Sequence, residues 1–198
     1  IEKITEVWSP SLEYLQDLET MTAKYRIKQY QHLVSSDAAT MNSCEEEIQK
    51  LESQIKDTSA KLNKIIEADR KAQKGKDDYE AASSAWEGYR ANSDEILQLS
   101  RDNKQQEAAK LMIGEVYENY TSFADKLTKL CDKFQVELDQ AKTMANVCTI
   151  VIIIVIVAVG LAIAAVTTLI GKIITNSITE PVEQIDAAVA SLRKGELS

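Results

Sequence analysis

The sequence predicts an all-α protein: an antiparallel, up-down-up-down four-helix bundle that continues into a transmembrane helix and one further amphipathic helix. Three observations predict this fold class. The 198 residues include only 6 Gly and 2 Pro, too few for the many turns of a β-sandwich or a doubly wound α/β domain. Apolar residues recur at helical spacing through most of the chain. A long uncharged apolar run then follows.

Four helices are expected in the outer domain, residues 1–148, because apolar residues recur there at intervals of three and four. The expected helices cover residues 2–36, 40–73, 77–101 and 105–148. Narrow apolar stripes of this kind suit the seams of a helix bundle. In chain order the stripes are Leu12, Leu15, Leu18, Thr22 and Tyr25; Ile48, Leu51, Ile55, Thr58, Leu62 and Ile65; Tyr79, Ala82, Trp86, Tyr89, Ser93 and Ile96; and Val116, Tyr120, Phe123, Leu127, Leu130, Phe134 and Leu138.

Three breaks separate the expected helices. Residues 35–44 are rich in turn and cap residues, and Ser43 with Glu46 fits a capping box. The second break lies around Gly75 and the third at residues 101–104. Connections this short force neighbouring helices to be antiparallel. The fourth helix contains no proline, so we expect it to continue unbroken into the apolar run.

The apolar run, Thr149–Ile170, contains no charged residue and as a helix is roughly 33 Å long, enough to cross a hydrocarbon core of about 30 Å. We expect a transmembrane helix over residues 149–171. Lys172 and two later cations favour a cytoplasmic C-terminal side. Residues 1–148 are then periplasmic, and their export requires an earlier targeting or transmembrane helix, which we expect before Ile1.

The inner segment, residues 172–198, carries a heptad seam, which requires a partner helix downstream or in another subunit. Its members keep alternating spacings of four and three, and they are Ile178, Val182, Ile185, Val189 and Leu192. Pro181 lies near the start of this helix, where proline is tolerated. A homodimer is the expected assembly.

Catalytic, metal and nucleic-acid functions find no support in the residue pattern. The net charge is −8 without a basic patch, which argues against a nucleic-acid partner. His32 is the only histidine, so no His-based metal cluster or catalytic triad can be assembled, and His32 itself is interpreted as a surface or packing residue. No phosphate-binding glycine loop is present. We therefore expect no enzyme activity, no cofactor and no metal.

A ligand site is expected between the helices, about 20 Å from the distal tip, where the helical rise brings all four helices to one layer. Two arginines, aromatic rings and a hydroxyl at this level can hold a small carboxylate. The candidate ligand-binding residues are Arg26, Tyr30, Trp86, Tyr89, Arg90, Tyr117, Tyr120 and Thr121. The alternative is structural: Arg26 pairs with Glu52, Arg90 pairs with an acid of the fourth helix such as Glu118, and the aromatic residues pack in the seams.

The last stretch of the chain resembles the first helix of a HAMP domain. The pattern is a proline followed by an aliphatic residue, then spaced aliphatic residues, and finally Gly-acidic-Leu. The matching residues are Pro181, Val182, Ile185, Ala188, Leu192, Gly195, Glu196 and Leu197. The match covers the first helix only, because the connector and second helix of a HAMP domain are absent.

The outer domain resembles the four-helix-bundle ligand-binding domain of methyl-accepting chemotaxis proteins. The residues that carry the resemblance are Arg26 with the following His32–Asp37, Trp86–Tyr89 (WEGY), and Ala108–Ala109. The resemblance implies a bacterial inner-membrane chemoreceptor that senses an organic acid or amino acid and signals through HAMP to a cytoplasmic module. Histidine kinases and diguanylate cyclases share this order of sensor bundle, membrane helix and HAMP domain, so they stay as alternatives. A bundle that docks a protein partner without a small ligand is another.

Overall fold

The computed structural model describes residues 2–194, apart from the side chains of Glu115 and Lys194, and these residues divide between Thr143 and Met144 into two compact units. Every regular element within residues 2–194 is helical, and no strand occurs there. The predicted all-α fold class is confirmed. Each unit is described by itself below.

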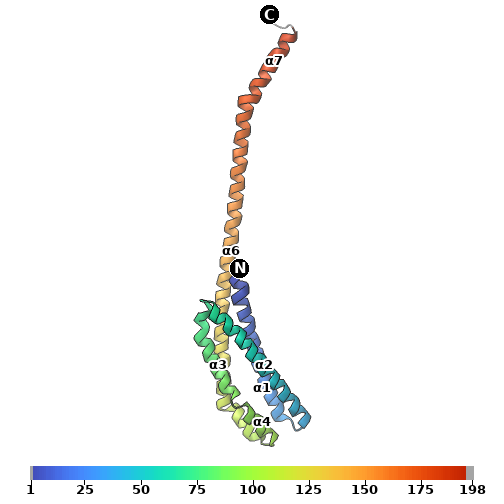
Figure 1. The fold of residues 1–198 in the computed structure, drawn as a ribbon, viewed down its shortest axis with the longest axis vertical. Coiled ribbons are helices and arrows are strands. Elements are labelled where there is room, and N and C mark those ends of the chain that lie inside the picture. The colour runs from blue at the N-terminus through green and yellow to red at the C-terminus, as the bar shows by residue number, and fades with distance from the viewer. Residues whose placement is uncertain (1, 195–198) are drawn as a thin grey trace. The chain divides into compact units, whose positions relative to one another are not determined.

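The first unit is the helix bundle. Figure 1 shows α1 lying beside α2, and α3 lying beside the first part of α6. A π-helical turn, η1, leads into α1, and a short 3-10 helix, η2, precedes α3. The elements are η1 (Ile4–Trp8), α1 (Ser9–Val34), α2 (Ala38–Ala68), η2 (Ala72–Gly75), α3 (Lys76–Arg90), α4 (Ser93–Arg101), α5 (Gln105–Ile113) and α6 (Glu115–Ile174), of which the last extends beyond this unit.

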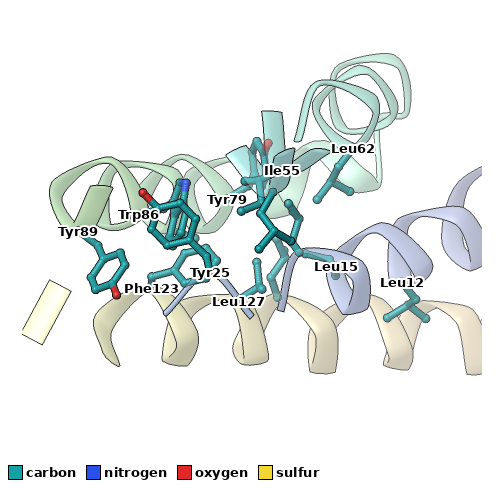
Figure 2. Packing of buried hydrophobic residues seen from close by; sticks show 14 of the residues in the cluster. Leu12, Leu15, Tyr25, Ile55, Leu62, Tyr79, Trp86, Tyr89, Phe123 and Leu127 are labelled. Atoms are coloured by element: carbon teal, nitrogen blue, oxygen red, sulfur yellow. The ribbon is translucent and has the colours of Figure 1, made fainter. Parts of the chain in front are cut away.

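Most of the seam residues predicted from the sequence form the core of this unit, but some, including Thr58 and Ile65, are only partly buried, and Ile66 is buried in place of Ile65. Figure 2 shows apolar side chains from α1, α2, α3 and α6 meeting in one cluster. Its largest members are aromatic: Trp86 packs within 5.2–5.4 Å, between ring centroids, of Tyr25, Tyr89 and Phe123. Full burial of each large apolar side chain contributes about 1.5–3 kcal/mol. Burial of these faces, rather than helix propensity, therefore holds the four helices together.

The first connection lies two residues earlier than the predicted helix bounds place it, because α1 ends at Val34 and α2 begins at Ala38. The Asp37 carboxylate accepts a 2.9 Å hydrogen bond from the backbone N–H of Thr40 and so caps α2. The capping box expected at Ser43 and Glu46 is wrong, since both residues lie inside α2. Asp37 provides an earlier N-cap, and the following alanines favour helix.

The second break includes Gly75 as predicted, but it begins earlier, because α2 ends at Ala68 and not at residue 73. At Gly75 the chain turns from η2 into α3 against the side of α6. Gly75 is buried, and a Cβ atom at this position would lie 2.7 Å from Leu130 and 2.8 Å from Phe134. Only glycine permits this close approach of the turn to α6.

The third and fourth predicted helices are interrupted, contrary to expectation. The chain between α3 and α4 turns at Ala91–Asn92, where the Asn92 amide donates to the Gly88 carbonyl at 3.1 Å. Such side-chain bonding to the backbone competes with helix continuation. Gly114 separates α5 from α6 with a non-helical backbone (φ −91°, ψ −131°). The turn at residues 102–104 is as predicted, with Asn103 in the left-handed region at φ 57°.

The second unit contains the rest of α6, a π-helical turn η3 (Thr175–Thr179) and α7 (Glu180–Lys194). Pro181 is the second residue of α7. Proline lacks an N–H and clashes with the carbonyl four residues earlier, which lies in η3, and this accounts for the widened turn. One helix in the described part of the chain is long and apolar enough to cross a membrane, with a mean hydropathy of 3.3 over 18 residues. The α7 seam is exposed, with Val189 at 48% and Ile185 at 62%. The HAMP-pattern residues Gly195, Glu196 and Leu197 lie outside the described residues.

Candidate functional site

Arg26 lies at the centre of a cage of tyrosine rings. Its guanidinium carbon is 4.7 Å from the ring centroid of Tyr117, 4.8 Å from Tyr120, 5.2 Å from Tyr30 and 5.9 Å from Tyr89. These rings come from α1, α3 and α6, and each distance is within cation–π range. One guanidinium nitrogen, Nη2, also donates to the Tyr30 hydroxyl at 2.9 Å. We call Arg26 with these four tyrosines the Arg26 cage.

The other terminal nitrogen of Arg26, Nη1, is buried and has no hydrogen-bond partner among the described residues, which exclude the side chains of Glu115 and Lys194. In the same part of the chain, no carboxylate lies within 4 Å of Arg26. A buried donor without a partner costs about 1–3 kcal/mol, and more when it is charged. The cage therefore holds a cation with a donor that an anionic acceptor can satisfy.

Tyr89 and Tyr120 of the cage stay protonated at neutral pH. Burial raises the pKa of Tyr89 far above its ordinary value of 10.0, and the nearby Arg26 charge only partly opposes this rise. Burial likewise raises the pKa of Tyr120. Both phenols are therefore neutral hydrogen-bonding groups beside the guanidinium, and they do not neutralise its charge.

Arg90 lies apart from the cage, in a groove of about 580 Å³ between α2 and α3 that Trp86 also lines. Its Nε donates to the Glu87 carboxylate at 3.1 Å, and its Nη1 is 3.9 Å from the Glu52 carboxylate. The structure therefore gives the two predicted arginines different partners. Both ion pairs of the packing alternative, Arg26 with Glu52 and Arg90 with Glu118, are wrong.

Thr121, the predicted hydroxyl ligand, does not donate its hydroxyl proton toward the Arg26 cage. Its Oγ1 is within 3.1 Å of the Tyr117 carbonyl and 3.0 Å of the Glu118 carbonyl, so it bonds to its own helix. Five of the eight predicted residues thus form the Arg26 cage, two line the groove, and Thr121 lies one turn along α6 from Tyr117.

A buried polar chain crosses the core between these two places, and the sequence analysis did not predict it. The Glu52 carboxylate accepts from the Tyr25 hydroxyl at 3.0 Å, which lies 2.7 Å from the Ser93 hydroxyl. The Gln29 amide donates to Ser93 at 2.9 Å and accepts from the Tyr89 hydroxyl. Tyr25, Gln29, Ser93 and Tyr89 are all buried.

The carboxylate fixes the direction of this chain. An ionised Glu52 can only accept, so it takes the single Tyr25 proton, and the Ser93 hydroxyl must then donate to Tyr25. Donors therefore point one way, from Tyr89 through Gln29, Ser93 and Tyr25 to Glu52. Burial is the main cause that raises the pKa of Tyr25 far above 10.0, which keeps its proton in place.

His32 forms a second polar cluster nearer the distal end. The ring is fully buried, with Nδ1 2.9 Å from the Ser100 hydroxyl and Nε2 2.9 Å from the Glu45 carboxylate. Arg101 donates to the same carboxylate at 2.6 Å and to Asn42 at 2.7 Å. His32 thus joins α1, α2 and α4, as a hydrogen-bonded packing residue.

The spacing of the α1 seam could have predicted that Gln29 and His32 are buried. Leu18, Thr22 and Tyr25 continue by four and three to Gln29 and His32, and all five are buried. The apolar pattern stops at Tyr25 because the next two seam residues are polar. A polar residue at a seam position predicts a buried hydrogen-bond partner on the facing helix.

Comparison with known families shows what kind of module this bundle is. A family model described as "Four helix bundle sensory module for signal transduction" matches residues 1–147. Comparison with curated proteins gives no match. Within the described residues, no group of three or more His, Cys, Asp or Glu side chains is placed to hold a metal ion. The family is one of signalling sensors, not of enzymes, and with the apolar helix it fits a membrane protein. The chain belongs to the family of four-helix-bundle sensory modules for signal transduction.

Proposed function

We propose that the chain is the sensing part of a bacterial inner-membrane chemoreceptor. Residues 1–148 are then the periplasmic ligand-binding domain, residues 149–171 cross the membrane, and residues 172–198 begin a cytoplasmic HAMP domain. The sensory family, the apolar helix and the HAMP-like spacing around Pro181 support this assignment. A signalling module downstream of HAMP provides the output.

We propose that the Arg26 cage binds a small carboxylate, an organic acid or an amino acid. The observation that carries this proposal is the buried Arg26 Nη1 without a partner. A carboxylate at this nitrogen forms a charge-assisted hydrogen bond, about 1.5–3 kcal/mol in favourable cases. The tyrosine hydroxyls and rings supply the further contacts.

A homodimer is the proposed assembly. The α7 seam has no partner within residues 2–194, and Leu192 is 58% exposed. On α1, Ile27 is 52% exposed and Val34 is 81% exposed, seven residues apart on one face of the helix. Tyr30 lies between them, so a dimer through this face places the second copy beside the Arg26 cage.

Ligand binding acts by biasing α6 between two positions. Helix shifts at subunit interfaces are about 1–2 Å. A carboxylate bound through Arg26 contacts Tyr117 and Tyr120, which belong to α6. The ligand changes the equilibrium only as far as it binds one position more tightly than the other.

The test is calorimetry of the full chain in detergent with a panel of dicarboxylic acids, tricarboxylic acids and amino acids. A panel member should bind, and Arg26→Gln should weaken its binding about tenfold or more, the loss expected when one charged hydrogen bond is removed. The exposed Arg70, changed to Gln, is the matched control. Equal affinity in the wild type and Arg26→Gln contradicts the cage. No binding by any member favours a protein partner instead.

A further inference from the structure

We infer that the groove between α2 and α3 is a second binding site, which takes a small zwitterion of the α-amino acid class. The groove has a volume of about 580 Å³, within the range of small-molecule sites. It shares no residue with the Arg26 cage, so the inference goes beyond the proposed carboxylate site.

Charges of both signs line this groove. Glu52 and Lys56 lie one turn apart on α2, and Glu87 and Arg90 lie on α3. Arg90 pairs with Glu87 at 3.1 Å. Lys56 has no carboxylate within 4 Å in the part of the chain that the structure describes. The groove thus offers an ammonium group that its own walls do not pair.

Trp86 supplies a second donor without a partner. The side chain is 6% exposed, and Tyr25, Tyr89 and Phe123 pack around its ring (Figure 2). No acceptor for its indole N–H occurs among residues 2–194, and the nitrogen is not enclosed by protein. Trp86 is one of the residues that line the groove. Buried indole N–H groups ordinarily have a partner, so this donor is available to a ligand.

These groups together fit a zwitterion. The Lys56 ammonium and the Trp86 N–H are donors for a carboxylate, while the second oxygen of Glu52 is an acceptor for an ammonium group. The four side-chain charges of the groove sum to zero, so a ligand of zero net charge adds no excess charge to it. A simple carboxylate leaves the second oxygen of Glu52 without a donor, and a simple amine leaves Lys56 without an anion.

Glu52 is held in place for this role by the core. Its Oε1 accepts the Tyr25 hydroxyl, and the hydrogen-bonded chain behind Tyr25 runs through Ser93 and Gln29. Since the carboxylate is oriented before a ligand arrives, less conformational entropy is lost on binding.

The experiment uses the intrinsic fluorescence of Trp86 in the full chain in detergent. The protein has 2 tryptophans, so Trp8→Phe leaves Trp86 as the single emitter. The proteinogenic L-amino acids are the probes, and each one that binds is compared with its decarboxylated amine and its α-hydroxy acid. We expect at least one amino acid to shift the emission saturably, with both analogues at least about tenfold weaker. Calorimetry with the unmodified chain repeats the measurement without the Trp8 substitution.

Three variants separate the groove from the Arg26 cage. Lys56→Gln should weaken the response at least about tenfold, while the matched control Lys64→Gln, also exposed on α2, should not. Arg26→Gln should leave it unchanged. Failure of all amino acids to shift the emission overturns the inference, as does an unchanged affinity in Lys56→Gln. Loss of the response in Arg26→Gln also overturns it, and then supports the carboxylate cage as the amino-acid site.

Discussion

Tyr25 donates a 3.0 Å hydrogen bond to Glu52, and this one bond sets the orientation of every hydroxyl and amide in the chain behind it. The chain links α1, α2, α3 and α4, and its side chains other than Glu52 are buried. Buried networks of this kind are stabilising only when every member is satisfied. They are therefore sensitive to the loss of a single hydroxyl.

Tyr25→Phe should lower the free energy of unfolding by about 1–3 kcal/mol, because the Ser93 hydroxyl loses its acceptor inside the core. Urea denaturation of the full chain in detergent measures the change. Tyr14→Phe is the matched control, since Tyr14 is only partly buried and no hydrogen bond of its hydroxyl occurs within residues 2–194. Equal losses in the two variants contradict the network.

The His32 cluster should give the bundle a pH-dependent stability. Its Arg101 hydrogen bond is the largest cause that lowers the pKa of Glu45 below 4.5 in the folded state. The contribution of Glu45 to stability is therefore complete above pH 4.5 and is lost as the pH falls through the folded-state pKa. The difference in melting temperature between wild type and Glu45→Gln should shrink below pH 4.5. A difference that is constant with pH contradicts this assignment.

Gly75→Ala should destabilise the protein by about 1–3 kcal/mol, because the added methyl group overlaps Leu130 and Phe134 in a packed core. Thermal unfolding measures the effect. Gly88→Ala is the control: its Cβ meets only the Asn119 side chain, at 3.3 Å, and alanine favours the α3 helix. Gly88→Ala should be neutral or stabilising, and the opposite order of the two variants would show that the turn is not tightly packed on α6.

The sequence predicted the seams well because apolar periodicity reports directly which face of a helix is buried. Periodicity did not reveal the break at Asn92, since Tyr89, Ser93 and Ile96 keep seam spacing across it. The candidate site was predicted by height along the bundle alone. The position of a residue along the bundle axis does not say to which side of its helix the side chain points. Arg26 and Arg90 therefore share a level but have different neighbours. The direction in which each side chain points is known only from the packed structure.

Transmission through α6 can be tested at Met144. The helix runs from Glu115 to Ile174, which is later than the predicted start because Gly114 interrupts it. The sequence of α6 contains no proline. Met144 is 67% exposed, so its side chain packs little. Proline at this position removes a helical hydrogen bond and clashes with the preceding turn, at about 3 kcal/mol or more.

Met144→Pro should leave ligand affinity nearly unchanged but abolish ligand-dependent output in the full-length receptor. The reason is that a kink absorbs a displacement of about 1–2 Å before it reaches the end of α6. Affinity is measured by calorimetry, and output by the activity of the downstream signalling module in cells. Met144→Ala, which keeps the helix, is the control and should signal normally. If output depends on dimerisation alone, the proline variant signals as well as the alanine variant, and the continuous-helix mechanism is refuted.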